Sequence, residues 1–107
     1  VLGNEAGRMI YDGDIIMAQK GKLLSVANRL SMKSWQVITR EVSFSDQSSK
    51  VYPITDNKER NEEFAQSVSL ALFDYLRKSK AKGFVLSLSG GADSACCAVL
   101  VAEMVRR

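Results

Sequence analysis

The sequence predicts a mixed α/β chain in two parts, a β-rich first part and a second part that begins a parallel sheet. Three observations lead to this prediction. Short apolar runs separated by glycine-containing polar pairs fill the first part, and apolar residues at helical spacing follow residue 57. A further apolar run then leads through two adjacent glycines into an almost wholly apolar segment, in the order strand, loop, helix.

The first part is expected to consist of strands. Short apolar runs bounded by turn residues predict strands at residues 9–11, 15–18 and 23–26. The Lys20-Gly21 pair between the last two runs is typical of a tight hairpin turn. Residues 35–44 are rich in β-branched and aromatic side chains and predict another strand, in which Trp35 is expected to be a core or interface residue.

A domain boundary is predicted at residues 45–57, where serines, Asp, Asn and the only proline gather. The expected division is 1–44, a linker at 45–57, and 58–107. Asp56 and Glu59 have the spacing of a capping box that starts a helix, and Gly83 is placed to stop it. The apolar face of this helix is predicted to comprise Phe64, Val68, Leu70, Leu72, Phe73, Tyr75 and Leu76.

The composition excludes several classes of protein. With 46% apolar and 25% charged residues, the 107-residue chain is not typical of a disordered protein. No apolar run approaches the roughly 18 residues that span a membrane, and the scattered basic residues behind the net charge of +3 do not indicate a nucleic-acid partner. Cys96 and Cys97 are expected to pack the last helix rather than act as nucleophiles, and unpaired thiols favour a cytoplasmic location. Because the chain lacks an initiating Met and stops within an expected helix, we expect a fragment of a longer protein.

The loop at residues 89–94 reads Ser-Gly-Gly-Ala-Asp-Ser, between an expected buried parallel strand at 84–88 and an expected buried helix at 95–105. Paired glycines let backbone N–H groups approach a ligand, and a helix N-terminus adds free donors, a combination that favours phosphate. Asp93 makes sense there if it holds Mg²⁺, which bridges carboxylate and phosphate. The loop has no lysine, so it is not a Walker A loop. The alternative is a plain turn in which Asp93 or Ser94 only caps the helix.

These six residues resemble the Ser-Gly-Gly-x-Asp-Ser signature of the ATP pyrophosphatases called PP-loop enzymes, whose domain is adenine nucleotide alpha-hydrolase-like. Residues 3–16 resemble the late part of the nitrilase-like glutaminase domain of glutamine-dependent NAD⁺ synthetases. Residues 73–79 and 83–88 resemble the beginning of the synthetase domain of the same enzymes. The resemblance implies that 1–44 ends a nitrilase-like α/β sandwich and that 58–107 begins a PP-loop domain.

The resemblance also implies a reaction. An ATP-dependent ligase of this family adenylates nicotinic acid adenine dinucleotide, releases pyrophosphate, and uses ammonia from glutamine to form NAD⁺ and AMP. It implies ATP and Mg²⁺ as cofactors, with Asp93 contributing to Mg²⁺. The ATP- and pyrophosphate-binding residues carried over are Ser87, Leu88, Ser89, Gly90, Gly91, Ala92, Asp93 and Ser94. Ser87 stands where many members have Gly, and its alternative role is to end the strand.

No catalytic residue is assigned within the chain, because the glutaminase Cys, Glu and Lys are expected before Val1. The segment alone is therefore expected to be inactive. Its expected partners are the rest of its own chain and further copies in a homo-oligomer. No membrane partner is expected. Two alternatives remain open. One is another PP-loop ligase that forms AMP, such as a GMP synthetase or a tRNA-modifying enzyme. The other is a non-catalytic nucleotide-binding module.

Overall fold

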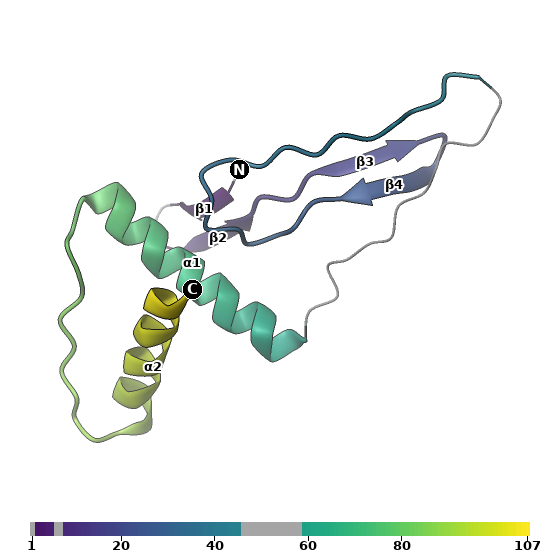
Figure 1. The fold of residues 1–107 in the computed structure, drawn as a ribbon. Coiled ribbons are helices and arrows are strands. Elements are labelled where there is room, and N and C mark those ends of the chain that lie inside the picture. Colours follow the sequence, from purple (N-terminus) through teal and green to yellow (C-terminus); the bar gives the residue numbers. More distant parts are fainter. Residues whose placement is uncertain (1, 6–7, 46–58) are drawn as a thin grey trace.

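The computed structural model describes residues 2–5, 8–45 and 59–107 (Figure 1). Within these residues the chain forms strands first and helices afterwards, so the mixed α/β class is confirmed. The elements are β1 (Leu2–Glu5), β2 (Met9–Asp12), β3 (Ile16–Gln19), β4 (Lys22–Val26), α1 (Arg60–Ser79) and α2 (Ala92–Arg106). Residues 46–57 of the predicted linker, including Asp56, lie outside the described residues.

The strands form two antiparallel pairs, β1 with β2 and β3 with β4. The predicted hairpin is confirmed, because Lys20 and Gly21 form its two-residue turn with φ of 49° and 75°. Positive φ at both central residues is the conformation that matches the twist of paired strands, and glycine adopts it without steric cost. An isolated hairpin is marginal in water, so each pair needs packing from elsewhere in the chain.

Three strand assignments differ from the sequence prediction. β1 was not expected, whereas residues 35–44 and 84–88 contain no assigned strand. Within the described residues neither segment pairs with a neighbouring strand, and a strand is stable only when its backbone groups are paired. The side chain of Gln19 instead donates a hydrogen bond to the Ser43 carbonyl at 2.7 Å, which holds the 35–44 segment alongside β3.

Both ends of α1 differ from the prediction. Glu59 is itself the N-cap residue, with no side-chain capping bond, so the expected capping box is not formed. The helix ends before Lys80, which takes the left-handed conformation with φ of 57°, and not at Gly83. Arg77 and Lys78 in the last turn complement the negative end of the helix dipole. The helix therefore ends at the left-handed Lys80, three residues before the glycine.

The buried face of α1 is also rotated from the predicted one. Ser69, Leu70 and Asp74 are its buried residues. Phe64 and Tyr75, two members of the predicted apolar face, are 60% and 53% exposed. The helix is apolar over a wide arc, and β1, β2 and α2 together cover only part of it. Burial of that leucine is worth about 2 kcal/mol.

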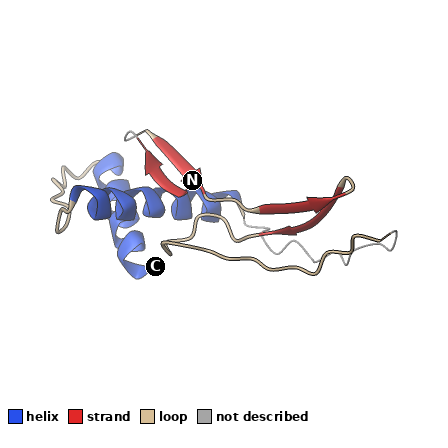
Figure 2. Ribbon diagram, turned by 90° about the horizontal axis from the view of Figure 1, so that it is seen from above, coloured by secondary structure: helices blue, strands red, loops and turns tan. Residues whose placement is uncertain are grey.

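The elements are arranged around α1. Figure 1 shows β1 and β2 lying against this helix, α2 packing beside it, and the β3–β4 hairpin extending away. The same arrangement is seen from above in Figure 2. At the far end of α2, Arg107 pairs with Glu62 of α1 at 2.7 Å. Among the described helices, neither is long and apolar enough to cross a membrane. The helix α1 therefore contacts both the strands β1 and β2 of the first part and the helix α2 of the second part.

Candidate functional site

The glycine loop lies directly before α2. Gly90 has φ of 85°, a left-handed conformation, and Gly91 is the extended N-cap residue with φ of −84°. A Cβ added at Gly90 would meet no atom within 4 Å, so its backbone conformation, and not crowding, requires glycine there. At Gly91 an added Cβ would come only within 3.6 Å of Ser89 Oγ, an ordinary contact. The described residues therefore leave the loop backbone open to an approaching ligand.

Two serine hydroxyls converge at this opening. Ser89 Oγ and Ser94 Oγ lie 3.2 Å apart, and Ser94 Oγ also donates to the Gly91 carbonyl at 3.0 Å. The bond to Gly91 turns the Ser94 side chain back over the N-terminus of α2. The first backbone N–H groups of a helix have no intrahelical acceptor. The first N–H groups of α2 are donors of the kind that an anion such as phosphate requires, and the two serine hydroxyls, here bonded to each other and to Gly91, lie beside them.

Asp93 stands in the first turn of α2 and is exposed. Within the described residues no group of three or more His, Cys, Asp or Glu side chains is placed to hold a metal ion. The chain therefore offers one carboxylate here and not a complete protein cage. That set fits Mg²⁺, which is commonly held by one or two carboxylates together with substrate phosphates and water.

The predicted site residues are only partly brought together. The loop and the first turn of α2 gather Ser89, Gly90, Gly91, Ala92, Asp93 and Ser94. Ser87 and Leu88 precede them on an exposed segment without assigned secondary structure, and Leu88 is 67% exposed. Cys96 and Cys97 are also exposed, so the expectation that they pack the helix is wrong for the described part of the chain.

A second cluster surrounds Asp74, which is fully buried although it carries a charge. Its Oδ2 accepts the backbone N–H of Asn4 at 2.8 Å and lies 3.0 Å from Lys78 Nζ. Its Oδ1 accepts bonds from the Arg77 guanidinium, with Nε at 3.0 Å. Although burial opposes the charged form, the hydrogen bonds from Lys78, Arg77 and Asn4 together lower the pKa of Asp74 below its ordinary value.

Gly3 completes this cluster from the strand side. Its φ is 98°, and a Cβ built there would lie 2.5 Å from Asp74 Oδ2. Sequence reasoning missed Asp74, because a charged residue in an amphipathic helix is normally solvated. Its signal was its spacing, four residues after Leu70, which places it on the same helical face.

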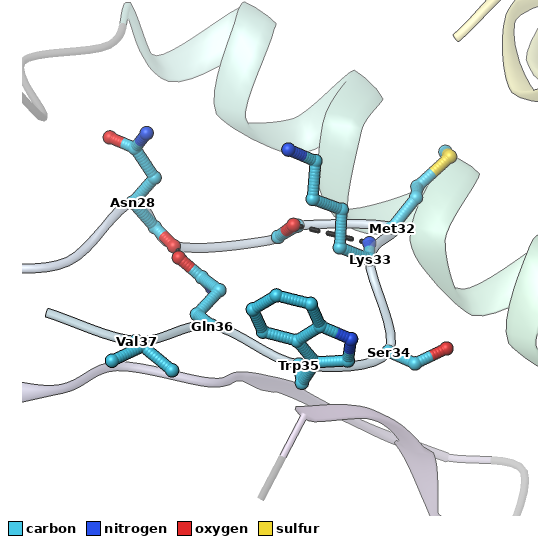
Figure 3. Close-up of a pocket in the computed structure, with 8 residues that line it drawn as sticks. Asn28, Met32, Lys33, Ser34, Trp35, Gln36 and Val37 are labelled. Atoms are coloured by element: carbon cyan, nitrogen blue, oxygen red, sulfur yellow. Dashed lines mark hydrogen bonds between the residues drawn. The ribbon is translucent and has the colours of Figure 1, made fainter.

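A separate hollow of about 720 Å³ lies on the 28–37 segment, and none of its lining residues belongs to the glycine loop. Figure 3 shows the Trp35 ring standing in it beside Lys33 and Gln36. Trp35 is 76% exposed, so the expectation of a core residue is wrong within the described residues, and the interface role stays a prediction.

Comparisons with known proteins agree over nearly the whole chain. The family model described as NAD synthase matches residues 64–107. A glutamine-dependent NAD(+) synthetase of Oryza sativa subsp. indica is 28% identical over 95% of this chain and 19% of its own length. A putative enzyme of the same name from Schizosaccharomyces pombe is 32% identical, over 97% of this chain and 20% of its own.

A solved structure gives the strongest similarity among these. The crystal structure of a glutamine-dependent NAD(+) synthetase from Cytophaga hutchinsonii matches with a TM-score of 0.78 and 51% sequence identity. The match covers 98% of this chain and 16% of that chain. The chain spans about a fifth of the length of the curated relatives it matches.

Proposed function

Because the chain belongs to the family of glutamine-dependent NAD⁺ synthetases, we propose that the full-length protein makes NAD⁺ by ATP-dependent amidation of nicotinic acid adenine dinucleotide. In this proposal residues 1–44 end the glutaminase part, 45–57 link the two parts, and 58–107 begin the synthetase part. Glutamine supplies the ammonia. The observation that carries the proposal is the convergence of Ser89 and Ser94 hydroxyls, 3.2 Å apart, at the open N-terminus of α2.

The first chemical step is adenylation. A carboxylate oxygen of the dinucleotide attacks the α-phosphorus of ATP. The bond between that phosphorus and the oxygen that bridges the α- and β-phosphates breaks. Pyrophosphate leaves with the electron pair of that bond. In the second step ammonia attacks the acyl carbon, AMP leaves, and the proton lost from nitrogen gives the neutral amide. Negative charge accumulates on the pyrophosphate oxygens during the first step, so preorganised donors there lower the barrier.

The loop residues would act on that leaving pyrophosphate. Backbone N–H groups from Gly91 onward and the hydroxyls of Ser89 and Ser94 would donate to its oxygens. The positive φ of Gly90 is a conformation found in loops whose successive N–H groups bind an anion. Asp93 would hold Mg²⁺ against the phosphates, and the ion supplies charge neutralisation when bound. Ser87 and Leu88 would line the approach to the loop.

The test uses the full-length protein with ATP, Mg²⁺, glutamine and one acceptor at a time. NAD⁺, AMP and pyrophosphate are expected in equal amounts with nicotinic acid adenine dinucleotide only. Amidation of the acceptor of a GMP synthetase, or modification of tRNA, would instead favour another ligase of the superfamily. Asp93→Asn is expected to lower the rate of NAD⁺ formation by about 10²-fold or more.

The matched control is Asp14→Asn, the same change at an exposed turn position of the first part. It should leave the rate of NAD⁺ formation unchanged within about twofold, the effect of an ordinary surface substitution. Equal rates for Asp93→Asn and the unmodified protein would contradict the assignment of the loop. Binding of ATP without any product would favour a non-catalytic module.

A further inference from the structure

The buried carboxylate of Asp74 joins two parts of the chain that are distant in sequence. It belongs to the last turns of α1, and Asn4, which donates its N–H, lies 70 residues away on β1. Lys78 extends the contact, since its Nζ donates to the Asn4 carbonyl at 2.5 Å and to Glu5 Oε1 at 3.1 Å. The carboxylate is 0% exposed, so its donors must come from the protein. These contacts form a buried junction between α1 and β1, which differs from an ion pair at the surface.

The strand side of the junction is shaped to this carboxylate. Gly3 is buried, and the space its missing Cβ would occupy lies 2.5 Å from Asp74 Oδ2. The positive φ of Gly3 brings the following N–H, that of Asn4, toward the same oxygen. The position of α1 against β1 is therefore set by a close approach that both sides require.

Further contacts continue along the same face of α1. Glu63 pairs with Arg29 at 2.8 Å, and the Gln66 side chain donates to the Leu30 carbonyl at 3.1 Å. Leu70 is 2% exposed on this face. The spacing of residues 63, 66, 70 and 74 is three or four, so they form one helical stripe directed at the first part. Asp74 and Lys78 lie at the end of the stripe nearest the glycine loop in the sequence.

A different side of α1 contacts α2. Glu62, one residue before Glu63 and therefore about 100° around the helix from it, pairs with Arg107, and α2 begins in the glycine loop. A shift of α1 against the first part would therefore move α2 and the loop with it. We propose that Asp74 is a positioning residue that fixes the synthetase part against the glutaminase part, so that ammonia released by one is used by the other. This inference rests on the proposed function.

The test compares two nitrogen sources in the full-length protein, glutamine and saturating ammonium. Asp74→Asn keeps the shape of the side chain but removes its charge. NAD⁺ formation from ammonium should stay within about twofold of the unmodified rate, whereas formation from glutamine should fall at least about fivefold. Glutamine hydrolysis should continue, so more glutamate should form for each NAD⁺ made.

Two variants keep the result decisive. Glu62→Gln makes the same charge change on α1 outside the stripe and should leave the ratio of the two rates unchanged. Lys78→Gln removes one exposed cation of the junction and should shift the ratio in the same direction by about twofold, the smaller effect because Arg77 still binds the carboxylate. If Asp74→Asn does not fold, Lys78→Gln decides.

A proportional loss with both nitrogen sources, or no change with either, would overturn the inference while the proposed function stands. So would an equal shift in Glu62→Gln. If the unmodified protein makes no NAD⁺ from ammonium or glutamine, the proposed function fails, and the inference fails with it.

Discussion

The junction around Asp74 and the loop around Gly90 differ in how completely their own chain surrounds them. The Asp74 carboxylate is fully buried, and donors from two elements satisfy both its oxygens. The loop residues from Ser87 to Asp93 are all exposed, and the apolar segment before them carries Val85 and Leu88 largely in contact with solvent. The described residues supply all the hydrogen-bond partners that the Asp74 carboxylate has in the structure. The loop presents the first backbone N–H groups of α2 and apolar surface that the described residues leave exposed.

The difference shows which residues have a role within the chain itself and which have a role only toward a binding partner. Asp74 is explained by contacts within the chain, which makes its contribution to stability predictable. Ser89, Gly90 and Asp93 are explained only by a partner, which we propose to be ATP and the sheet that the full-length protein adds. Changes at the junction should therefore alter the docking of α1, while changes at the loop should alter catalysis.

The largest effect on structure is expected from Asp74→Ala. It leaves the Arg77 and Lys78 cations without their buried partner and frees the Asn4 N–H. Removing one partner of a buried pair costs about 3–5 kcal/mol, and a value near 3 is expected here because both cations are partly exposed. Amide hydrogen exchange of Asn4 in the full-length protein should accelerate by about 10²-fold. Unchanged protection would mean that Asp74 does not hold the strand.

Gly3→Ala should have the next largest effect. The new Cβ must occupy space 2.5 Å from Asp74 Oδ2, and the φ of 98° is unfavourable for alanine. Strain and displacement together are expected to cost about 2 kcal/mol. Gly21→Ala is the matched control, since its φ of 75° is also positive but no atom lies within 4 Å of its added Cβ. Gly21→Ala measures the effect of backbone strain alone, and Gly3→Ala measures strain together with crowding. Equal decreases in the thermal midpoints of the two variants would contradict the close approach of Gly3 to Asp74.

The junction should also weaken in acid. Hydrogen bonds lower the folded-state pKa of Asp74 below its ordinary value of 3.8, against the opposing effect of burial. A carboxyl with a lowered pKa stabilises the fold fully above the unfolded value, and this stabilisation is lost as pH falls through the folded value. The difference in thermal midpoint between the unmodified protein and Asp74→Asn should therefore be constant above about pH 5 and shrink below pH 3.8. A constant difference down to about pH 2 would argue against the charged carboxylate as its origin.

Glu62→Gln should have the smallest effect. The Glu62 side chain is 52% exposed, and it pairs with Arg107, whose side chain is 16% exposed, at 2.7 Å between α1 and α2. The loss should be about 1 kcal/mol, because solvent screens the exposed Glu62 carboxylate and Arg107 keeps its pair with Glu103. The thermal midpoint should move little, and any change should shrink further in high salt. A loss as large as that of Asp74→Ala would remove the distinction between the two faces of α1.

Sequence reasoning located the elements that local chemistry determines. The Lys20-Gly21 turn and the helical repeat after residue 57 depend on neighbouring residues, and both are present. β1 was missed because Gly3 and Asn4 give it no alternating pattern, and its stabilising contact with Asp74 comes from 70 residues away. Residues 35–44 have strand composition without a partner strand in the described residues, and composition does not specify partners.

The features of the candidate site also fall into those that a local sequence pattern predicts and those that depend on tertiary contacts. Residues 89–94 predict phosphate binding from a short local pattern, and that role stays a prediction. The adjoining strand at 84–88 was not realised, since a parallel strand forms only beside others. The spacing of Asp74 from Leu70 indicated only a shared helical face, and its burial could not be predicted because burial of a charge follows from tertiary contacts.

The most direct test of the central claim follows one oxygen atom. Nicotinic acid adenine dinucleotide labelled with ¹⁸O in its carboxylate is incubated with ATP, Mg²⁺ and glutamine in the presence of the full-length protein. If the carboxylate is adenylated at the glycine loop, one labelled oxygen should appear in AMP, and Asp93→Asn should suppress its formation while Asp14→Asn does not. Labelled oxygen in inorganic phosphate, or AMP without label, would contradict the account.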